Sequence, residues 1–172
     1  MPTSDLSALV VLVLPALAVV AALKDLTSYT IPNWISLALL AAFGPAAFLS
    51  GAPLPAIGLC LLVGFAGLIG GMVMFALRWI GGGDAKLLAG CALWIGWPGV
   101  SHFLLWTTLG GGALAVGLLT IRKWAPLFAP VSAGPGWMTR LLTKDADVPY
   151  GVAIAVGALM AFPMSPLARG VF

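Results

Sequence analysis

Two aspartates, Asp25 and Asp84, are the residues of this chain best suited to do chemistry. Asp25 follows the first long apolar run, and Asp84 closes the Gly-Gly-Gly-Asp sequence at residues 81–84, after the third run. The chain is 62% hydrophobic and has only five acidic residues. A carboxylate beside a membrane-spanning segment is energetically costly and usually marks a functional site. We therefore expect Asp25 and Asp84 to act together.

Two carboxylates held close together cannot both ionise, so such a pair shares one proton. The ionised member can take a proton from a water molecule between them, while the protonated member polarises a peptide carbonyl group. This predicts aspartyl proteolysis, with carboxylate oxygens on the order of 5 to 6 Å apart in the assembled site. The chemistry requires no metal or cofactor, and Cys60 and Cys91 stand alone, without the spacing of a metal site.

The glycines before Asp84 suit a proteolytic site. Glycine adopts positive φ and lets another backbone approach without a side-chain clash. We expect residues 81–83 to leave the helix as a loop that lines a cavity facing both aspartates. Gly81 and Gly83 are therefore predicted to lie against the substrate backbone.

Composition predicts an integral membrane protein. The mean hydropathy is +1.12 and only 8% of residues are charged. Several apolar runs approach the roughly 20 residues that cross a bilayer. A soluble domain of 172 residues leaves too much of its surface wet to hide this much apolar area. The runs are long and uninterrupted rather than alternating, so the expected fold is an all-α bundle of membrane-spanning helices.

Turn-forming residues divide the chain into about six spans within one domain, residues 1–172. The first run has Asp5 ahead of it, no basic segment before it and no cleavage site after it, so we expect it to stay in the mature protein. The predicted spans are approximately Leu6–Leu23, Trp34–Leu49, Ala56–Trp79, Leu87–Trp97, Ser101–Ile121 and Val148–Met164.

The basic residues predict the orientation, because short cytoplasmic loops retain positive charge. With the N-terminus outside, seven of the eight basic residues fall on the cytoplasmic side and only Arg169 falls outside. The same alternation of spans places Asp25 and Asp84 together at the cytoplasmic face. The seven residues are Lys24, Arg78, Lys86, Arg122, Lys123, Arg140 and Lys144.

These motifs resemble those of a known family. Asp25 precedes Ile-Pro-Asn at residues 31–33, the Gly-Gly-Gly-Asp sequence is followed two positions later by Lys86, and Val-Pro-Tyr-Gly at residues 148–151 opens the last span. Together, in this order and over six spans, they resemble the type IV prepilin peptidases, membrane aspartyl proteases with a Gly-x-Gly-Asp motif. The resemblance covers nearly the whole chain.

The resemblance implies a function. Such enzymes lie in the bacterial inner membrane and cut a short basic leader from prepilins at the cytoplasmic face, after a glycine and before a hydrophobic helix. Asp25 and Asp84 match the family's catalytic pair. Larger members carry paired Cys-x-x-Cys motifs and also methylate the new N-terminus. Those motifs are absent from this sequence, which resembles the short, peptidase-only branch serving Flp or Tad-type pili, so methylation is not expected.

Three further residues could contact substrate. Tyr29 and Asn33 lie near Asp25 and could bind a substrate backbone, but a turn containing Pro32 would use both for local bonding. Lys86 could anchor the cytoplasmic face. It could instead tune Asp84 or meet an acidic residue of the substrate.

The sequence also predicts roles for a set of glycines and for the stretch 122–147. Small residues at 64, 67, 70 and 71, all glycines, should let helices approach closely. The stretch 122–147 mixes basic and aromatic residues with prolines and is expected on the inner leaflet. It could guide a leader toward the aspartates or be a passive surface loop.

Other functions fit parts of the pattern. Asp25 beside Lys24 could be an ordinary interfacial ion pair. A small proton-coupled transporter also uses membrane carboxylates, although usually near the midplane and with inverted repeats. A non-enzymatic subunit of a pilus or secretion assembly would not need the glycines before Asp84.

Overall fold

The structure is a computed structural model that describes residues 3–128, 135–143 and 146–171. Within these ranges the regular elements are helices and no strand occurs, which confirms the all-α prediction. Lys144 and part of the 122–147 stretch lie outside the described residues. The elements are α1 (Thr3–Val11), α2 (Val13–Ser28), α3 (Asn33–Leu49), α4 (Leu54–Ala76), α5 (Gly82–Phe128), α6 (Gly136–Leu142), α7 (Tyr150–Ala161), the 3₁₀ helix η2 (Phe162–Met164) and α8 (Pro166–Arg169).

Four helical stretches in the described chain are long and apolar enough to cross a membrane. They are Leu6–Ser28, Leu54–Ala76, Gly82–Trp124 and Tyr150–Arg169, and α3 is a shorter apolar helix of 17 residues. Large apolar side chains on α4 are widely exposed, as Leu62 (66%) and Phe65 (65%) show. Such surfaces match a lipid environment. The protein is therefore a helical membrane protein.

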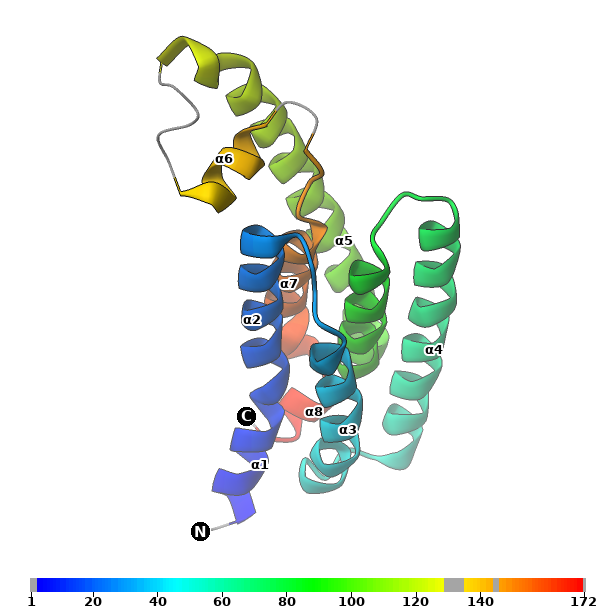
Figure 1. Ribbon diagram of the computed structural model, residues 1–172. Coiled ribbons are helices and arrows are strands. Elements are labelled where there is room, and N and C mark those ends of the chain that lie inside the picture. The colour runs from blue at the N-terminus through cyan, green and yellow to red at the C-terminus, as the bar shows by residue number, and fades with distance from the viewer. Residues whose placement is uncertain (1–2, 129–134, 144–145, 172) are drawn as a thin grey trace.

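Helix α5 contains two of the six predicted spans. Its backbone leaves helical geometry at Gly96 (φ 60°, ψ −164°) and Trp97 (φ −97°, ψ 138°), and the chain reverses direction there (Figure 1). Gly96 is required on two grounds, since its φ is positive and an added Cβ would collide with Cys60 Sγ. The predicted turn is thus present, one residue earlier than expected. The first half, residues 82–95, is only about 21 Å long at 1.5 Å per residue, so the count of six full spans is approximate.

Helix α4 packs on the first half of α5 through glycines. An added Cβ at Gly64 would lie 2.7 Å from Leu93 Cβ, at Gly67 3.1 Å from Ala92 Cβ, and at Gly71 3.0 Å from the Ala85 carbonyl oxygen. These three confirm the expected close helix contact. The prediction is wrong for Gly70, which has no atom within 4 Å of such a Cβ and faces open space.

Trp94 joins three parts of the bundle. Its side chain is fully buried, and its indole N–H donates to the Leu39 carbonyl oxygen of α3 at 2.8 Å. The ring also meets Phe43 edge-on, with centroids 6.2 Å apart. The Ser165 hydroxyl, just before α8, donates to the Trp94 carbonyl oxygen at 2.6 Å. Trp94 therefore fixes α3 and the C-terminal segment on the first half of α5.

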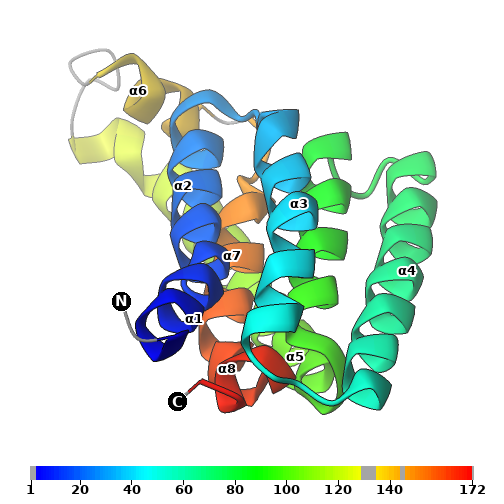
Figure 2. The same ribbon diagram turned by 90° about the horizontal axis from the view of Figure 1, so that it is seen from below.

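The helix ends that carry the motifs meet at one end of the bundle. The C-terminal ends of α2 and α4 and the N-terminal ends of α5 and α7 all lie there, opposite α8 and the N-terminus of the chain (Figure 1). In the view from below, α7 lies behind α2 and α3, whereas α4 occupies the edge beside α5 (Figure 2). Asp25 and Asp84 thus belong to the same end.

The glycine contacts make a testable difference within α4. Gly64→Ala should destabilise the protein by about 1 to 3 kcal/mol, because the new methyl group has to displace Leu93. Gly70→Ala should be neutral or slightly stabilising, because alanine favours helix and its methyl group meets open space. Thermal unfolding of the two variants in detergent measures the difference. Equal melting temperatures would show that α4 does not pack on α5 through Gly64.

Candidate active site

Asp25 is a buried carboxylate that caps a different helix. It lies in the last turn of α2, only 5% exposed, and its Oδ2 accepts a hydrogen bond of 2.7 Å from the Gly151 backbone N–H. Gly151 lies in the first turn of α7, where backbone N–H groups have no partner within the helix. A carboxylate at this position satisfies one such donor and interacts favourably with the helix dipole. Asp25 therefore joins α2 to the start of α7.

Gly151 is required for this contact. An added Cβ would lie 2.8 Å from Asp25 Oδ2 and 2.8 Å from Ile31 Cδ1. Sequence reasoning placed Gly151 in the motif that opens the last span and missed its contact with Asp25. Pro149 carried the available signal, because a proline at a helix start implies that the N–H group two residues later is free to bind a side chain.

Asp84 caps its own helix. It lies in the first turn of α5, and its Oδ2 accepts a hydrogen bond of 3.2 Å from the Gly81 N–H. This is the backward half of a capping box, in which an acidic side chain reaches the N–H that precedes the helix. The other oxygen, Oδ1, is buried and has no hydrogen-bond partner among the described residues.

The prediction that residues 81–83 leave the helix as a loop is wrong for Gly82 and Gly83. Gly82 and Gly83 begin α5, and positive φ occurs instead at Arg78 (φ 59°), in the connection after α4. Asp84 therefore starts a helix rather than closing the third span. The physical reason is that the Asp84 carboxylate caps the helix two residues after it begins, which stabilises helical geometry at the glycines.

The glycines at 81 and 83 serve close approaches inside the protein. An added Cβ at Gly81 would lie 3.0 Å from Asp84 Oδ2, and one at Gly83 would lie 3.0 Å from Ile31 Cβ. That Gly81 and Gly83 also contact a substrate backbone stays a prediction.

Ile31 links the two aspartate-bearing regions. It is 9% exposed and lies against Gly83 at the start of α5 and against Gly151 at the start of α7. The Ile-Pro-Asn motif therefore supplies the apolar contact between the two helix starts, a role that sequence reasoning did not assign.

Lys86 and Asn33 pair with each other. The Lys86 ammonium donates to Asn33 Oδ1 at 2.8 Å and so joins α5 to α3. At about 100° per residue, Lys86 points to nearly the opposite side of α5 from Asp84. This geometry disfavours the hypothesis that Lys86 tunes Asp84. Asn33 makes a tertiary hydrogen bond, which neither sequence-based alternative foresaw.

Tyr29 is the C-cap residue of α2, and its backbone is left-handed with φ 54°. Its N–H donates to the Asp25 carbonyl oxygen at 2.8 Å. Its hydroxyl is buried. Burial raises the pKa of Tyr29 above its usual value, although the nearby Arg122 guanidinium lowers it in part. Tyr29 therefore keeps its proton at neutral pH and can act as a hydrogen-bond donor near Asp25.

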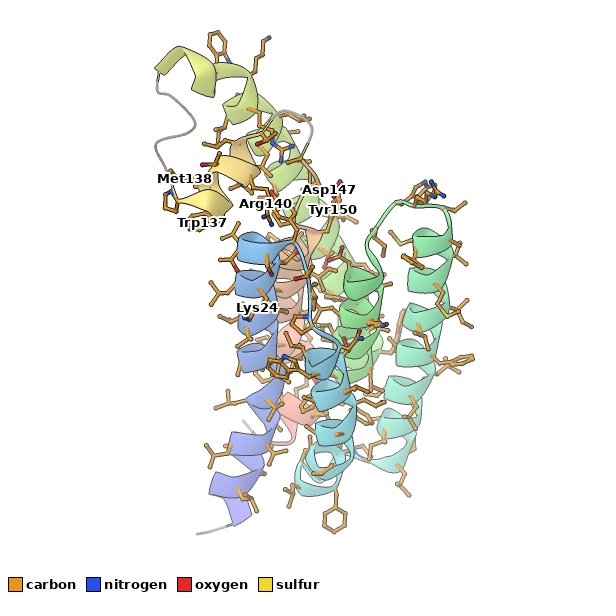
Figure 3. All side chains as sticks on the ribbon, viewed as in Figure 1. Lys24, Trp137, Met138, Arg140, Asp147 and Tyr150 are labelled. Carbon is orange, nitrogen blue, oxygen red and sulfur yellow. The ribbon has the colours of Figure 1, made fainter. Side chains whose placement is uncertain are left out.

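Arg122 holds the segment between α6 and α7. Its guanidinium donates to three backbone carbonyl oxygens, those of Leu141 (2.9 Å), Ala146 (2.7 Å) and Asp147 (2.8 Å). Arg122 is 7% exposed, and sequence reasoning treated it only as a cytoplasmic basic residue. Asp147 and Tyr150 lie on the chain that descends from α6 into α7 (Figure 3). Arg122 thus ties the second half of α5 to the chain leading to Gly151.

Two cavities open on different faces of α5. One, of about 520 Å³, lies between α3, α4 and the first half of α5 and is lined at one end by Asn33 and Lys86. The other, of about 340 Å³, is lined by Trp79, Ile80 and Tyr150, among others. Neither of these two cavities is lined by Asp25 or Asp84, so neither is the shared cavity that the sequence predicts.

The fold and the site define a class of protein: a helical membrane protein with two acidic side chains held at one end of the bundle. The sequence pattern of the type IV leader peptidase family matches residues 12–116, and the chain belongs to this family.

A curated relative supports the assignment over a shorter region. The chain is 33% identical over 86 residues to the prepilin leader peptidase/N-methyltransferase of Aeromonas hydrophila. The match covers 42% of this chain and 30% of the relative, so it spans less than a third of that protein's length. No solved structure matches the chain.

The contact between Gly151 and Asp25 can be tested by Gly151→Ala. The added methyl group should force Asp25 and Ile31 away from α7 and disrupt a buried hydrogen bond, at a cost of about 2 kcal/mol or more. The apparent Tm in detergent should fall by roughly 5 °C. Gly117→Ala is the control, because a Cβ at Gly117 meets no atom within 4 Å. If both variants melt like the wild type, α2 and α7 are not packed at Gly151.

Proposed function

We propose that this protein is an aspartic endopeptidase that removes the N-terminal leader of prepilin-like proteins at the cytoplasmic face of the bacterial inner membrane. One observation supports it above the others: in a chain of the type IV leader peptidase family, Asp25 and Asp84 are held at the same end of the bundle. The substrate is a protein with a short basic leader followed by a hydrophobic helix.

The reaction uses the two carboxylates and one water molecule. The ionised aspartate removes a proton from water, and the resulting hydroxide attacks the scissile carbonyl carbon while the protonated aspartate donates its proton to the carbonyl oxygen. The tetrahedral intermediate then collapses: the first aspartate gives the proton taken from water to the leaving amine, the second aspartate takes a proton from a hydroxyl group of the intermediate, and the C–N bond breaks. No metal or cofactor enters these steps.

The hydrogen bonds at the site suit this chemistry. Asp25 and Asp84 each use Oδ2 to accept a backbone N–H, which holds the carboxylates in place. Asp84 Oδ1 remains without a partner among the described groups, so it is available to hold the shared proton or the water. Gly81 and Gly83 lie at the start of α5 and Tyr29 lies near Asp25, whereas Asn33 lies with Lys86 at the end of the cavity between α3 and α4. We propose that these four residues position the substrate.

The helix-end position of the aspartates favours a peptidase over a transporter. Asp25 lies in the last turn of α2 and Asp84 in the first turn of α5. Proton-coupled transporters usually place such carboxylates near the bilayer midplane. A soluble leader arriving from the cytoplasm reaches a site at the helix ends directly. The reaction proposed is peptide cleavage alone, without methylation of the new N-terminus.

Replacement of either aspartate tests the pair. Asp25→Asn and Asp84→Asn should each reduce cleavage of a coexpressed prepilin by about a thousandfold or more, because an amide cannot exchange the shared proton. Gel shift and N-terminal sequencing measure cleavage, and membrane fractionation checks insertion. Asp147→Asn is the matched control, since this exposed aspartate contributes only its backbone oxygen to Arg122. Substantial cleavage by either active-site variant would reject the two-aspartate mechanism.

Orientation has its own test. Reporters fused after Asp25 and near Gly82 should read cytoplasmic, whereas reporters after Gly51 and Pro98 should read external, because seven of the eight basic residues favour this arrangement. Alkaline phosphatase and green fluorescent protein fusions report the two sides. If Asp25 and Gly82 reported opposite faces, the aspartates could not share a water and the proposed mechanism would fail.

A further inference from the structure

A groove on the outside of the bundle lies between α3 and α4. It has a volume of about 520 Å³, and we call it the α3–α4 groove. Its walls are apolar side chains, more than half of whose surface is exposed, and its floor is formed by small residues of α5. The wall residues used below are Leu37, Leu40, Leu61 and Phe65, and the floor residues are Ala89 and Gly90.

The groove exists because α3 and α4 both pack on the first half of α5. Leu39 of α3 meets α5 at Gly90, and Gly64 of α4 meets it at Leu93. The floor follows one face of α5, with Lys86, Ala89, Gly90 and Leu93 at the i, i+3, i+4 and i+7 positions. Ala89 and Leu93 on this face are buried between α3 and α4, whereas Lys86 at its end is exposed.

The small residues of the floor favour a helix as the occupant. In a bilayer an apolar groove gains little from exchanging lipid for apolar side chains, because lipid tails are equally apolar. Close packing is what selects a helix, and Gly or Ala at the contact lets the backbones approach. Gly64 and Gly90 also line this groove but pack on Leu93 and Leu39 within the bundle, so the small side chain of Ala89 provides this surface on the floor.

Lys86 adds a charge to one end of the groove. It lies two residues after Asp84, at the end of the bundle where the aspartates lie, and its side chain is exposed. The partner found for its ammonium is the neutral Asn33 side chain, at 2.8 Å. None of the residues that line the groove is acidic. An occupant that supplies a carboxylate at this end would therefore complete the charge pair.

We propose that the α3–α4 groove binds the hydrophobic transmembrane helix of the substrate, with Lys86 pairing to a carboxylate near the cytoplasmic end of that helix. This inference rests on the proposed peptidase function and specifies how its substrate docks. The substrate reaches the groove sideways from the bilayer.

The path from the groove to the aspartates crosses the start of α5. Lys86 and Asp84 point to nearly opposite sides of this helix, so the substrate chain between the docked helix and the scissile bond passes over its N-terminal end. That end carries Gly81, Gly82 and Gly83, which present no side chains to the passing chain. A short extended segment of substrate spans the distance.

Photocrosslinking tests the occupant directly. The probe is a synthetic prepilin with a short basic leader ending in glycine, followed by about 20 apolar residues with one glutamate in the first turn. A photoreactive phenylalanine is placed at Leu61, inside the groove, or at Leu62, its exposed neighbour outside the lining, in the Asp84→Asn background. We expect a covalent adduct with the probe from position 61 and little from position 62.

The other crosslinking results overturn the proposal. Equal adducts from both positions, or no probe adduct from position 61, would show that the helix does not dock in the groove. A phospholipid adduct alone at position 61, identified by mass spectrometry, would assign the groove to lipid. Crosslinking needs no turnover, so it reports on docking whether or not the probe is cleaved. If the wild-type protein leaves the probe uncut, the peptidase function is rejected instead.

Cleavage assays test the charge and the shape of the groove. Leu61→Trp should slow cleavage of the probe about tenfold by filling the groove, whereas Leu62→Trp should leave the rate within about twofold. Lys86→Glu should also slow cleavage about tenfold, and replacing the probe's glutamate by lysine should restore most of the rate with this variant. Unchanged cleavage by Leu61→Trp, or failure of the charge swap to restore activity, would contradict the proposed docking.

Discussion

The arrangement of this site depends on the capping of helix starts by carboxylates. Asp25, carried by α2, satisfies a free N–H at the start of α7, and Asp84 satisfies the N–H that precedes its own helix. The start of α7 needs such a partner because the Gly151–Asp25 hydrogen bond is buried, where no water can replace it. The same two hydrogen bonds that stabilise the helix starts also hold the acidic side chains at one end of the fold. Structural stability and the proposed chemistry therefore use the same groups.

Close packing around glycines makes these hydrogen bonds possible. Gly151 lets the Asp25 carboxylate reach the backbone of α7, and Gly83 lets Ile31 lie against the start of α5. Ile31 contacts both helix starts, so the connection between α2 and α3 lies between the two halves of the site.

The two faces of α5 have different roles in this interpretation. One face carries Asp84, which caps the start of the helix, and the other presents Lys86 and Ala89 to the α3–α4 groove. An enzyme that cuts a protein anchored in the membrane has to hold a helix on its flank and a peptide bond at its end. Under the proposed function, the first half of α5 connects these two tasks within a single short helix.

The sequence alone determined the class of the protein and the outline of its fold. Its apolar runs predicted a helical membrane protein, its turn residues predicted the reversal near Trp97, and the glycines at 64, 67 and 71 predicted a close helix contact. These features follow from local composition and spacing, which a single sequence displays. The proposed site residues Asp25 and Asp84 were also singled out from the scarcity of charge.

The tertiary structure alone decided how distant residues meet. Gly151 lies 126 positions from Asp25, and Lys86 lies 53 positions from Asn33, so neither hydrogen bond leaves a periodic signal in the sequence. The glycines before Asp84 looked like a loop because glycine disfavours helix, yet the capping carboxylate outweighs that preference. Gly70 resembles its neighbours in sequence but faces outward, since the direction of a helix face is set by the helices packed against it. Long-range hydrogen bonds and packing therefore decided the geometry of the site, because both depend on which helices come together in the folded bundle.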